Sequence, residues 1–205
     1  MASLKREILR RVTPPLRWIK WPRRFHFWRS IPGFFSYHEL YRNVVSQAES
    51  GAHFVEVGSW KGKSAAFMAV EIANSRKKIR FDCVDVWLDT DPEEYAGDGD
   101  SMRSPPYEAF LRNTATVAEF VNPIRLPSVE AAKLYADKSL DFVFIDGAHD
   151  YDNVRDDIAA WRQKIRLGGI LAGDDFPADG VKRAVTEAFP QFELTSTSYH
   201  WLVRF

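Results

Sequence analysis

The chain has 205 residues, of which 45% are hydrophobic and 27% charged, and 28 Lys and Arg balance 28 Asp and Glu. This length can bury a full core without disulfides, and the single cysteine, Cys83, excludes a disulfide framework within one chain. The longest apolar stretch, near residues 65–70, is too short to cross a membrane, and the basic N-terminus lacks the apolar core of a secretory signal. We therefore expect a cytoplasmic protein with one main globular domain.

The N-terminal arm, residues 1–35, differs in composition from the rest. Residues 1–30 carry nine Lys or Arg and one acid, Glu7, with three interleaved tryptophans. Leu4, Ile8 and Val12 have helical spacing until a proline pair ends the pattern. We expect this arm to pack against a second subunit in a homo-oligomer, to lie on an anionic membrane surface, or to bind an acidic or lipid-linked glycan. A nucleic-acid partner is not expected, because the remaining residues carry a net charge of −8.

From residue 36 to residue 205 the sequence predicts one α/β domain. Ser36 and Glu39 form a capping box for a first helix that extends to about residue 48. Apolar runs then alternate with helical patterns. The expected strands are 53–57, 80–86, 123–126, 141–146, 169–174, 192–195 and 200–205. The expected helices are 63–75, 107–119, 129–135, 151–165 and 180–188, with Asp150 and Asp179 as N-caps of the last two. This order predicts a Rossmann-like, doubly wound, mostly parallel seven-stranded sheet that ends in an antiparallel hairpin.

The first strand leads into a glycine loop, Glu56-Val-Gly58-Ser59-Trp60-Lys61-Gly62-Lys63-Ser64. Such a loop lets backbone N–H groups and a helix N-terminus approach a ligand. The ending Gly62-Lys63-Ser64 favours a P-loop, but that motif needs four residues between its glycines and here there are three. The spacing also departs from the Gly-x-Gly-x-x-Gly of dinucleotide-binding proteins.

Two later strands end in carboxylates, Asp146 after the first and Asp174 with Asp175 after the second. If these strands are neighbours, the three side chains can converge at the carboxyl edge of the sheet, where open α/β sheets bind ligands. Three carboxylates without a cysteine cluster suit Mg²⁺ or Mn²⁺. His149 stands beside them just before a helix, whose dipole favours the neutral ring, so His149 is the expected general base.

These features together resemble the class I S-adenosylmethionine-dependent methyltransferases. The resemblance rests on Glu56-x-Gly58-x-x-x-Gly62 with Asp85 at the end of the second strand, although Trp60 stands where the family has its middle glycine. The motif Asp146-Gly-x-His149-x-Tyr151, followed by Gly173-Asp174-Asp175, is similar to a branch of metal-dependent sugar and macrolide O-methyltransferases and cephalosporin-hydroxylase-like proteins. The match extends from about residue 51 to residue 205.

The resemblance implies S-adenosylmethionine as cofactor and assigns its contacts. Glu56, Gly58 and Ser59 would line the methionine part, Asp85 would bind the ribose hydroxyls, and Ser128 would lie at the adenine. The remaining cofactor-binding residues expected are Gly62, Ser64 and Asp146.

The expected reaction is methyl transfer to a hydroxyl of a small molecule or glycan, with the cation binding acceptor oxygens and His149 taking the proton. The alternatives are a non-catalytic cofactor-binding protein on the same fold and, less favoured, a P-loop phosphotransferase. The long acidic loop 88–106 follows the second strand at the ligand edge, where a lid and an ordinary solvated loop are equally expected.

Overall fold

A computed structural model describes residues 23–88 and 105–205 of the chain. The expected helix near residues 4–12 and most of the acidic loop lie outside these residues. The helices are α2 (His38–Gln47), α3 (Lys63–Ser75), α4 (Pro106–Thr114), α5 (Ser128–Ala132), α6 (Tyr151–Arg162) and α7 (Asp179–Ala188), with 3-10 turns η2 (Trp28–Ser30) and η5 (Ala115–Phe120). The strands are β1 (His53–Val57), β2 (Arg80–Asp85), β3 (Asn122–Arg125), β4 (Leu140–Ile145), β5 (Ile165–Gly173), β6 (Glu193–Leu194) and β7 (Trp201–Arg204).

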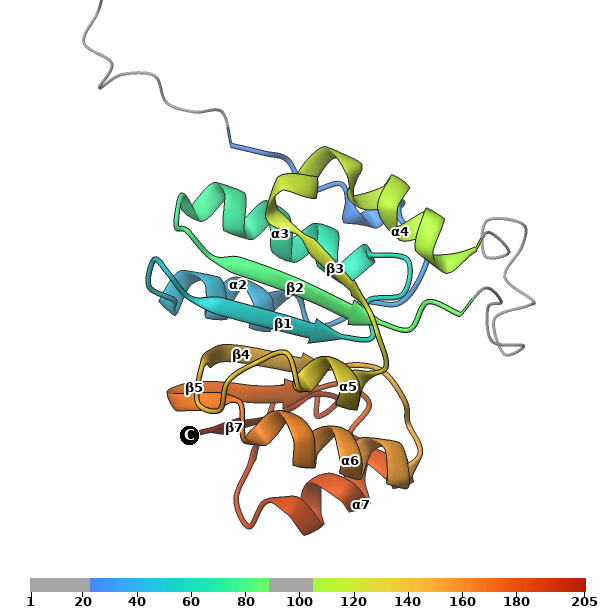
Figure 1. The fold of residues 1–205 in the computed structure, drawn as a ribbon, viewed down its shortest axis with the longest axis vertical. Coiled ribbons are helices and arrows are strands. Elements are labelled where there is room, and N and C mark those ends of the chain that lie inside the picture. The colour runs from blue at the N-terminus through green and yellow to red at the C-terminus, as the bar shows by residue number, and fades with distance from the viewer. Residues whose placement is uncertain (1–22, 89–104) are drawn as a thin grey trace, which may run out of the picture.

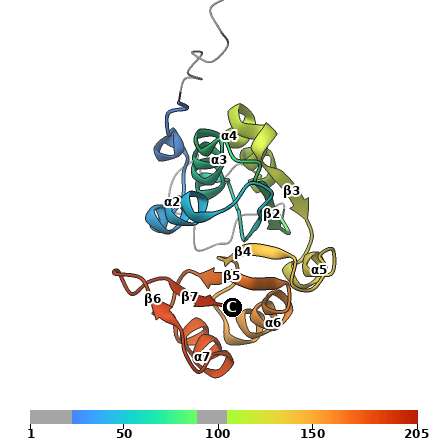
Figure 2. The same ribbon diagram turned by 90° about the vertical axis from the view of Figure 1, so that its left-hand side faces the viewer.

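The seven strands form one sheet in the order β3-β2-β1-β4-β5-β7-β6. The first five pair in parallel, whereas β7 pairs antiparallel with both β5 and β6. The arrowheads of β1, β2 and β4 accordingly point toward the same edge in Figure 1, and the β6–β7 hairpin closes the opposite side from β3 in Figure 2. The predicted fold class is confirmed, and β4 and β5 are neighbours, which is the condition under which their terminal carboxylates can converge.

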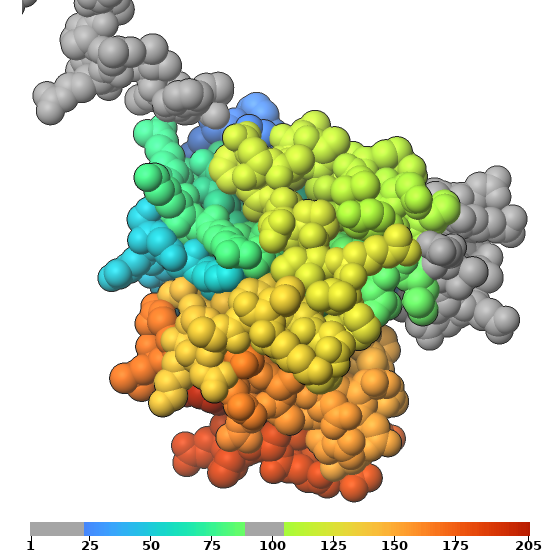
Figure 3. Space-filling model, viewed as in Figure 1, coloured from blue at the N-terminus to red at the C-terminus, as the bar shows by residue number. Residues whose placement is uncertain are grey.

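Alternate residues of the central strands face two separate cores. One core joins β1 and β4 to α2 and α3 through large aromatic side chains, including Phe54, Phe142 and Phe144. The other joins the opposite faces of the same strands to α5, α6 and α7, through Val55, Val143 and other aliphatic residues. The helices therefore cover both faces, as a doubly wound sheet requires. On the face shown in Figure 3, the chain from α4 to α6 forms one continuous surface.

The described part of the N-terminal segment packs on the outer side of α3. The Arg24 backbone N–H donates to Asn74 Oδ1 over 2.8 Å, and the His26 ring stacks on Phe67 with centroids 4.4 Å apart. Trp28 meets the same phenyl ring edge-on. The segment from Arg24 to Trp28 is thus held against α3.

Several predicted boundaries are wrong for local physical reasons. Ser36 does not cap the first helix, because Tyr37 is the flanking residue and the Ser36 hydroxyl instead meets His200 Nε2 at 2.8 Å. Asp179 is the first residue of α7 and makes no cap. Asp150 does cap α6, accepting the Asn153 N–H.

Some elements also differ in length from the predicted ones. The predicted helix 107–119 changes after Thr114 into a 3-10 turn, with Val117 outside helical geometry. The predicted helices 129–135 and 151–165 end early, at Ala132 and Arg162, and β5 begins early, at Ile165. Within the described ranges, no helix is long and apolar enough to cross a membrane.

Candidate active site at the carboxyl edge of the sheet

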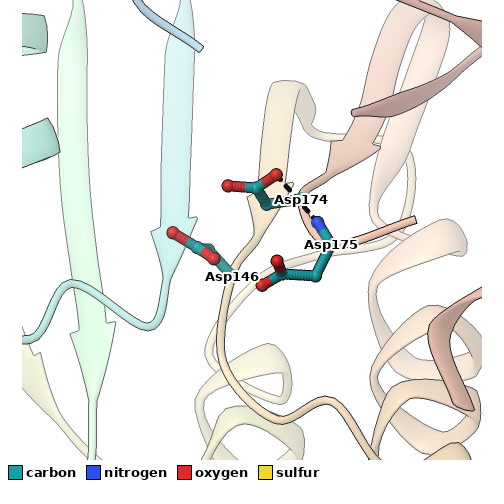
Figure 4. A group of neighbouring side chains, drawn as sticks. All are labelled: Asp146, Asp174 and Asp175. Carbon is teal, nitrogen blue, oxygen red and sulfur yellow. Dashed lines mark hydrogen bonds between the residues drawn. The ribbon is translucent and has the colours of Figure 1, made fainter. Parts of the chain in front are cut away.

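Three carboxylates meet where β4 and β5 end. Asp146 follows β4, while Asp174 and Asp175 follow β5, and one oxygen from each lies within 4.8 Å of the others (Figure 4). Backbone hydrogen bonds continue past the strand ends, where Asp146 N–H donates to Val57 O and Asp174 N–H donates to Ile145 O. These bonds fix the position of Asp146 relative to β1 and of Asp174 relative to β4. Opposite ligands in an octahedral Mg²⁺ shell are roughly 4.2 Å apart. The trio is therefore grouped on the scale of such a shell, and its oxygens would draw closer together to share one small cation.

The three carboxylates of this trio repel one another when they are ionised. Burial and the charge of Asp174 raise the pKa of Asp146 well above its usual value. Burial and the neighbouring Asp175 raise the pKa of Asp174 to about 6. The pKa of Asp175 is lowered instead, chiefly by its hydrogen bond with His149. A divalent cation would remove the cost of holding the three charges together.

Two histidines flank the carboxylates. His149 Nε2 lies 2.8 Å from Asp175 Oδ2, and both side chains are partly exposed. His200, which is 2% exposed, directs Nε2 toward Asp174 Oδ1 at 3.4 Å and toward Ser36. Burial lowers the pKa of His200, which favours its neutral form. His149 was predicted at this place, but His200 was not.

The glycine loop between β1 and α3 touches the carboxylate site through Gly58. Gly58 has a φ of 88°, and a Cβ there would lie 2.0 Å from the Asp146 carbonyl oxygen. Only glycine permits this approach. Trp60 keeps a left-handed conformation, with a φ of 38°, although it replaces the family's glycine. Its ring lies against Gly33, where a Cβ would come within 2.7 Å of it. Gly62, with a φ of 82°, precedes the first residue of α3.

Glu56 is buried beneath this loop with one oxygen lacking a partner. Its side chain is 0% exposed, Oε2 accepts the Tyr41 hydroxyl over 2.6 Å, and burial raises its pKa to about 7. Among buried side-chain atoms of the described residues, Glu56 Oε1, Ser59 Oγ and His38 Nδ1 make no hydrogen bond. A buried polar atom without a partner is costly. Two of the three belong to the predicted cofactor site, so a ligand with a cationic donor fits here. Ser64 lies nearby, buried in the first turn of α3.

Asp85 is the last residue of β2, and Ser128 is the first residue of α5. Asp85 accepts the backbone N–H groups of Trp60 and Trp87, each over 2.8 Å, which leaves further lone pairs for hydroxyl donors. Burial raises its pKa. The Ser128 hydroxyl accepts the Trp161 indole N–H over 2.8 Å. Burial raises the pKa of the neighbouring Asp157 to about 6, and a hydrogen bond with Ser128 offsets part of that rise. Since this hydroxyl is occupied on the α6 side, Ser128 can offer a ligand mainly its backbone.

Two tyrosines that were not predicted reach the site, one from α2 and one from the residue before it. The Tyr37 hydroxyl donates to Asp146 Oδ2 over 2.7 Å, and the Tyr41 hydroxyl donates to Glu56 Oε2. Their spacing of four residues, which puts both rings on one helix face, was the available signal.

Comparisons with known proteins agree with this geometry. A family described as "Methyltransferase domain" matches residues 55–176. Comparison with curated protein sequences gives no match. The solved structure of the O-methyltransferase NovP has a TM-score of 0.62 at 18% identity, over 90% of this chain and 84% of that one. Cofactor-bound Rv0187 from MTB has a TM-score of 0.57 at 16% identity, over 84% and 82%. CalS11, a calicheamicin methyltransferase, also scores 0.57, at 14% identity, over 82% and 76%.

Proposed function

Since the chain belongs to the class I S-adenosylmethionine-dependent methyltransferases, we propose that it methylates a hydroxyl oxygen with the help of a divalent cation. The observation that carries this proposal is the convergence of Asp146, Asp174 and Asp175 beside the glycine loop. Family membership removes the P-loop alternative. The relatedness of NovP in fold, and its description as an O-methyltransferase, agree with an oxygen acceptor.

In this proposal the cofactor lies over the glycine loop. Glu56 Oε1 would accept the ammonium of the methionine part, which satisfies a buried oxygen that has no partner. Ser59 Oγ would gain a partner in the same way. Gly58, Gly62 and Ser64 would shape the loop and the start of α3 around the ligand. Asp85 would accept the ribose hydroxyls, and the chain at Ser128 would border the adenine.

The three carboxylates would hold Mg²⁺ or Mn²⁺, which prefer oxygen ligands. When bound, such a cation lowers the pKa of a hydroxyl and helps to fix its orientation. Asp175 can serve both the cation and His149, because its carboxylate has two oxygens. Asp146 would face the cofactor through its backbone and the cation through its side chain.

His149 would accept the hydroxyl proton. In the neutral ring, donation from Nε2 to Asp175 leaves the lone pair on Nδ1, so the carboxylate selects the tautomer and the ring orientation. The deprotonated oxygen then attacks the sulfonium methyl carbon. A C–O bond forms as the C–S bond breaks, and S-adenosylhomocysteine leaves.

The test begins with ligand binding and continues with an acceptor screen. S-adenosylmethionine at one hundred times its dissociation constant should stabilise the protein by about 2.7 kcal/mol, roughly 5–10 °C for a domain of this size, whereas ATP and NAD should not. In a screen of sugar, macrolide-glycoside and phenolic hydroxyls, turnover should require Mg²⁺ or Mn²⁺. It should be lost with chelator and in His149→Ala, while the cofactor-induced shift remains. Full turnover with chelator would refute the role of the cation.

A further inference from the structure

The segment that precedes the sheet enters the active site at two points. Tyr37 and Tyr41 stand four residues apart and are 2% and 0% exposed. Their rings meet at 4.9 Å, and both pack on Phe144 of β4, Tyr37 at 4.1 Å and Tyr41 edge-on at 5.3 Å. Phe142 also meets the Tyr41 ring edge-on. Such packing fixes the rings, and with them the hydroxyls, against the floor of the site.

Each hydroxyl occupies one oxygen of a different carboxylate. Tyr41 donates to Glu56 Oε2 over 2.6 Å, and Tyr37 donates to Asp146 Oδ2 over 2.7 Å. Glu56 belongs to the cofactor side of the site, whereas Asp146 belongs to the carboxylate trio. The two contacts therefore act on two separate carboxylates of the site, although the tyrosines touch each other.

A carboxylate turns easily about its last torsion, which has broad preferences. A short hydrogen bond to one oxygen sets the plane of the group and so directs the second oxygen. For Glu56, the second oxygen is the buried Oε1 that has no partner. When the carboxylate is already oriented, ligand binding does not have to order that side chain, so the entropy cost of ordering does not weaken the affinity.

We propose that Tyr37 and Tyr41 are positioning residues, with Tyr41 orienting Glu56 for S-adenosylmethionine and Tyr37 orienting Asp146 for the divalent cation. The inference rests on the proposed function, because it assigns those ligands to Glu56 and Asp146. Neither tyrosine needs to touch a reacting atom. The ligand sites on the strands are incomplete without this segment, which lies outside the part of the chain that matches the family, residues 55–176.

The variants Tyr37→Phe and Tyr41→Phe test this, since each removes one hydroxyl and keeps its ring. Tyr135→Phe is the matched control. Tyr135 is also buried and donates to a buried carboxylate, Asp82, over 2.9 Å, but on a β2 residue outside the site. Affinity for S-adenosylhomocysteine is measured by titration calorimetry, and affinity for Mn²⁺ by electron paramagnetic resonance.

Tyr41→Phe should weaken S-adenosylhomocysteine binding about tenfold and change Mn²⁺ affinity less than twofold, while Tyr37→Phe should show the reverse pattern. Tyr135→Phe should lower the melting temperature and leave both affinities unchanged. Wild-type affinities in both tyrosine variants, or equal losses of both ligands in each, would overturn the inference. Wild-type protein that binds S-adenosylhomocysteine but no Mn²⁺ would overturn the Tyr37 half, and wild-type protein that binds neither would refute the proposed function itself.

Discussion

Glu56 should destabilise the folded protein at neutral pH when no cofactor is bound. Burial raises the pKa of Glu56 from 4.5 to about 7. A raised pKa means that the folded state binds the proton more tightly than the unfolded state. The free energy of unfolding is therefore highest below about pH 4.5 and falls as the pH rises toward 7. At 1.36 kcal/mol per pKa unit, the loss is about 3 kcal/mol.

The matched variant is Glu56→Gln, which keeps the shape and an oxygen for the Tyr41 hydroxyl but cannot ionise. Urea unfolding at pH 5, 6, 7 and 8 should show that wild-type stability falls relative to the variant by about 2.5 kcal/mol across this range, because part of the loss already occurs below pH 5. Asp174 titrates in both proteins, whereas the pKa of Asp146 is raised partly by the charge of Glu56, so the difference reports Glu56 together with its coupling to Asp146. Parallel pH curves for the two proteins would refute the reasoning.

The cofactor should reverse this pH dependence, because its ammonium favours the ionised carboxylate. With a pKa of about 7, the ionised fraction of Glu56 rises from roughly 9% at pH 6 to 50% at pH 7. Affinity for S-adenosylhomocysteine should therefore increase about fivefold between these values in the wild type. In Glu56→Gln the affinity should be low and independent of pH over this interval. A wild-type affinity that is equal at pH 6 and pH 7 would contradict the assignment.

Three further predictions concern stability and reactivity. Burial raises the pKa of Asp82, but hydrogen bonds, chiefly from His53, outweigh burial and lower the pKa to about 2. The resulting contribution to the free energy of unfolding, about 2 kcal/mol, is present above pH 4. This contribution should be lost in the wild type as the pH falls to 2, whereas Asp82→Asn should show no such loss. Gly58→Ala should lower the free energy of unfolding in urea by about 3 kcal/mol or more, because the new Cβ meets the Asp146 carbonyl. Gly51 has a φ of 107° but open space around it, so Gly51→Ala should cost only about 1 kcal/mol. Equal losses in the two variants would contradict this contrast. Burial raises the pKa of the Cys83 thiol well above its usual value, so Ellman's reagent should label it only after unfolding, and rapid labelling of the native protein would contradict its placement.

The features predicted from sequence are those that depend on local pattern and chain order. Apolar runs, strand–helix alternation and strand-end acids are enough to put Asp146 and Asp174 at the carboxyl edge of one parallel sheet. That their two strands are neighbours is set by the strand order of the structure. Trp60 shows a limit of motif matching: its side chain departs from the family, but its φ of 38° retains a glycine-like backbone.

The missed features depend on contacts between distant parts of the chain. Tyr37 lies 109 residues from Asp146, and Ser36 lies 164 residues from His200. Nothing in the local sequence of these residues specifies a partner, and the expectation that Ser36 caps α2 followed a local rule that a tertiary contact overrides. The residues that join the site from outside the sheet can therefore be identified only from the three-dimensional placement of the segment before β1.

The central claim is that a divalent cation binds at the carboxylate trio next to the transferable methyl group. The most direct measurement is the NMR relaxation of S-adenosylmethionine labelled with ¹³C in that methyl, bound to the protein, with and without Mn²⁺. We expect Mn²⁺ to broaden the methyl signal strongly in the wild type and not in an Asp174→Asn, Asp175→Asn variant that still binds the cofactor. A methyl signal that Mn²⁺ leaves unchanged in the wild type, or broadens equally in both proteins, would contradict the claim.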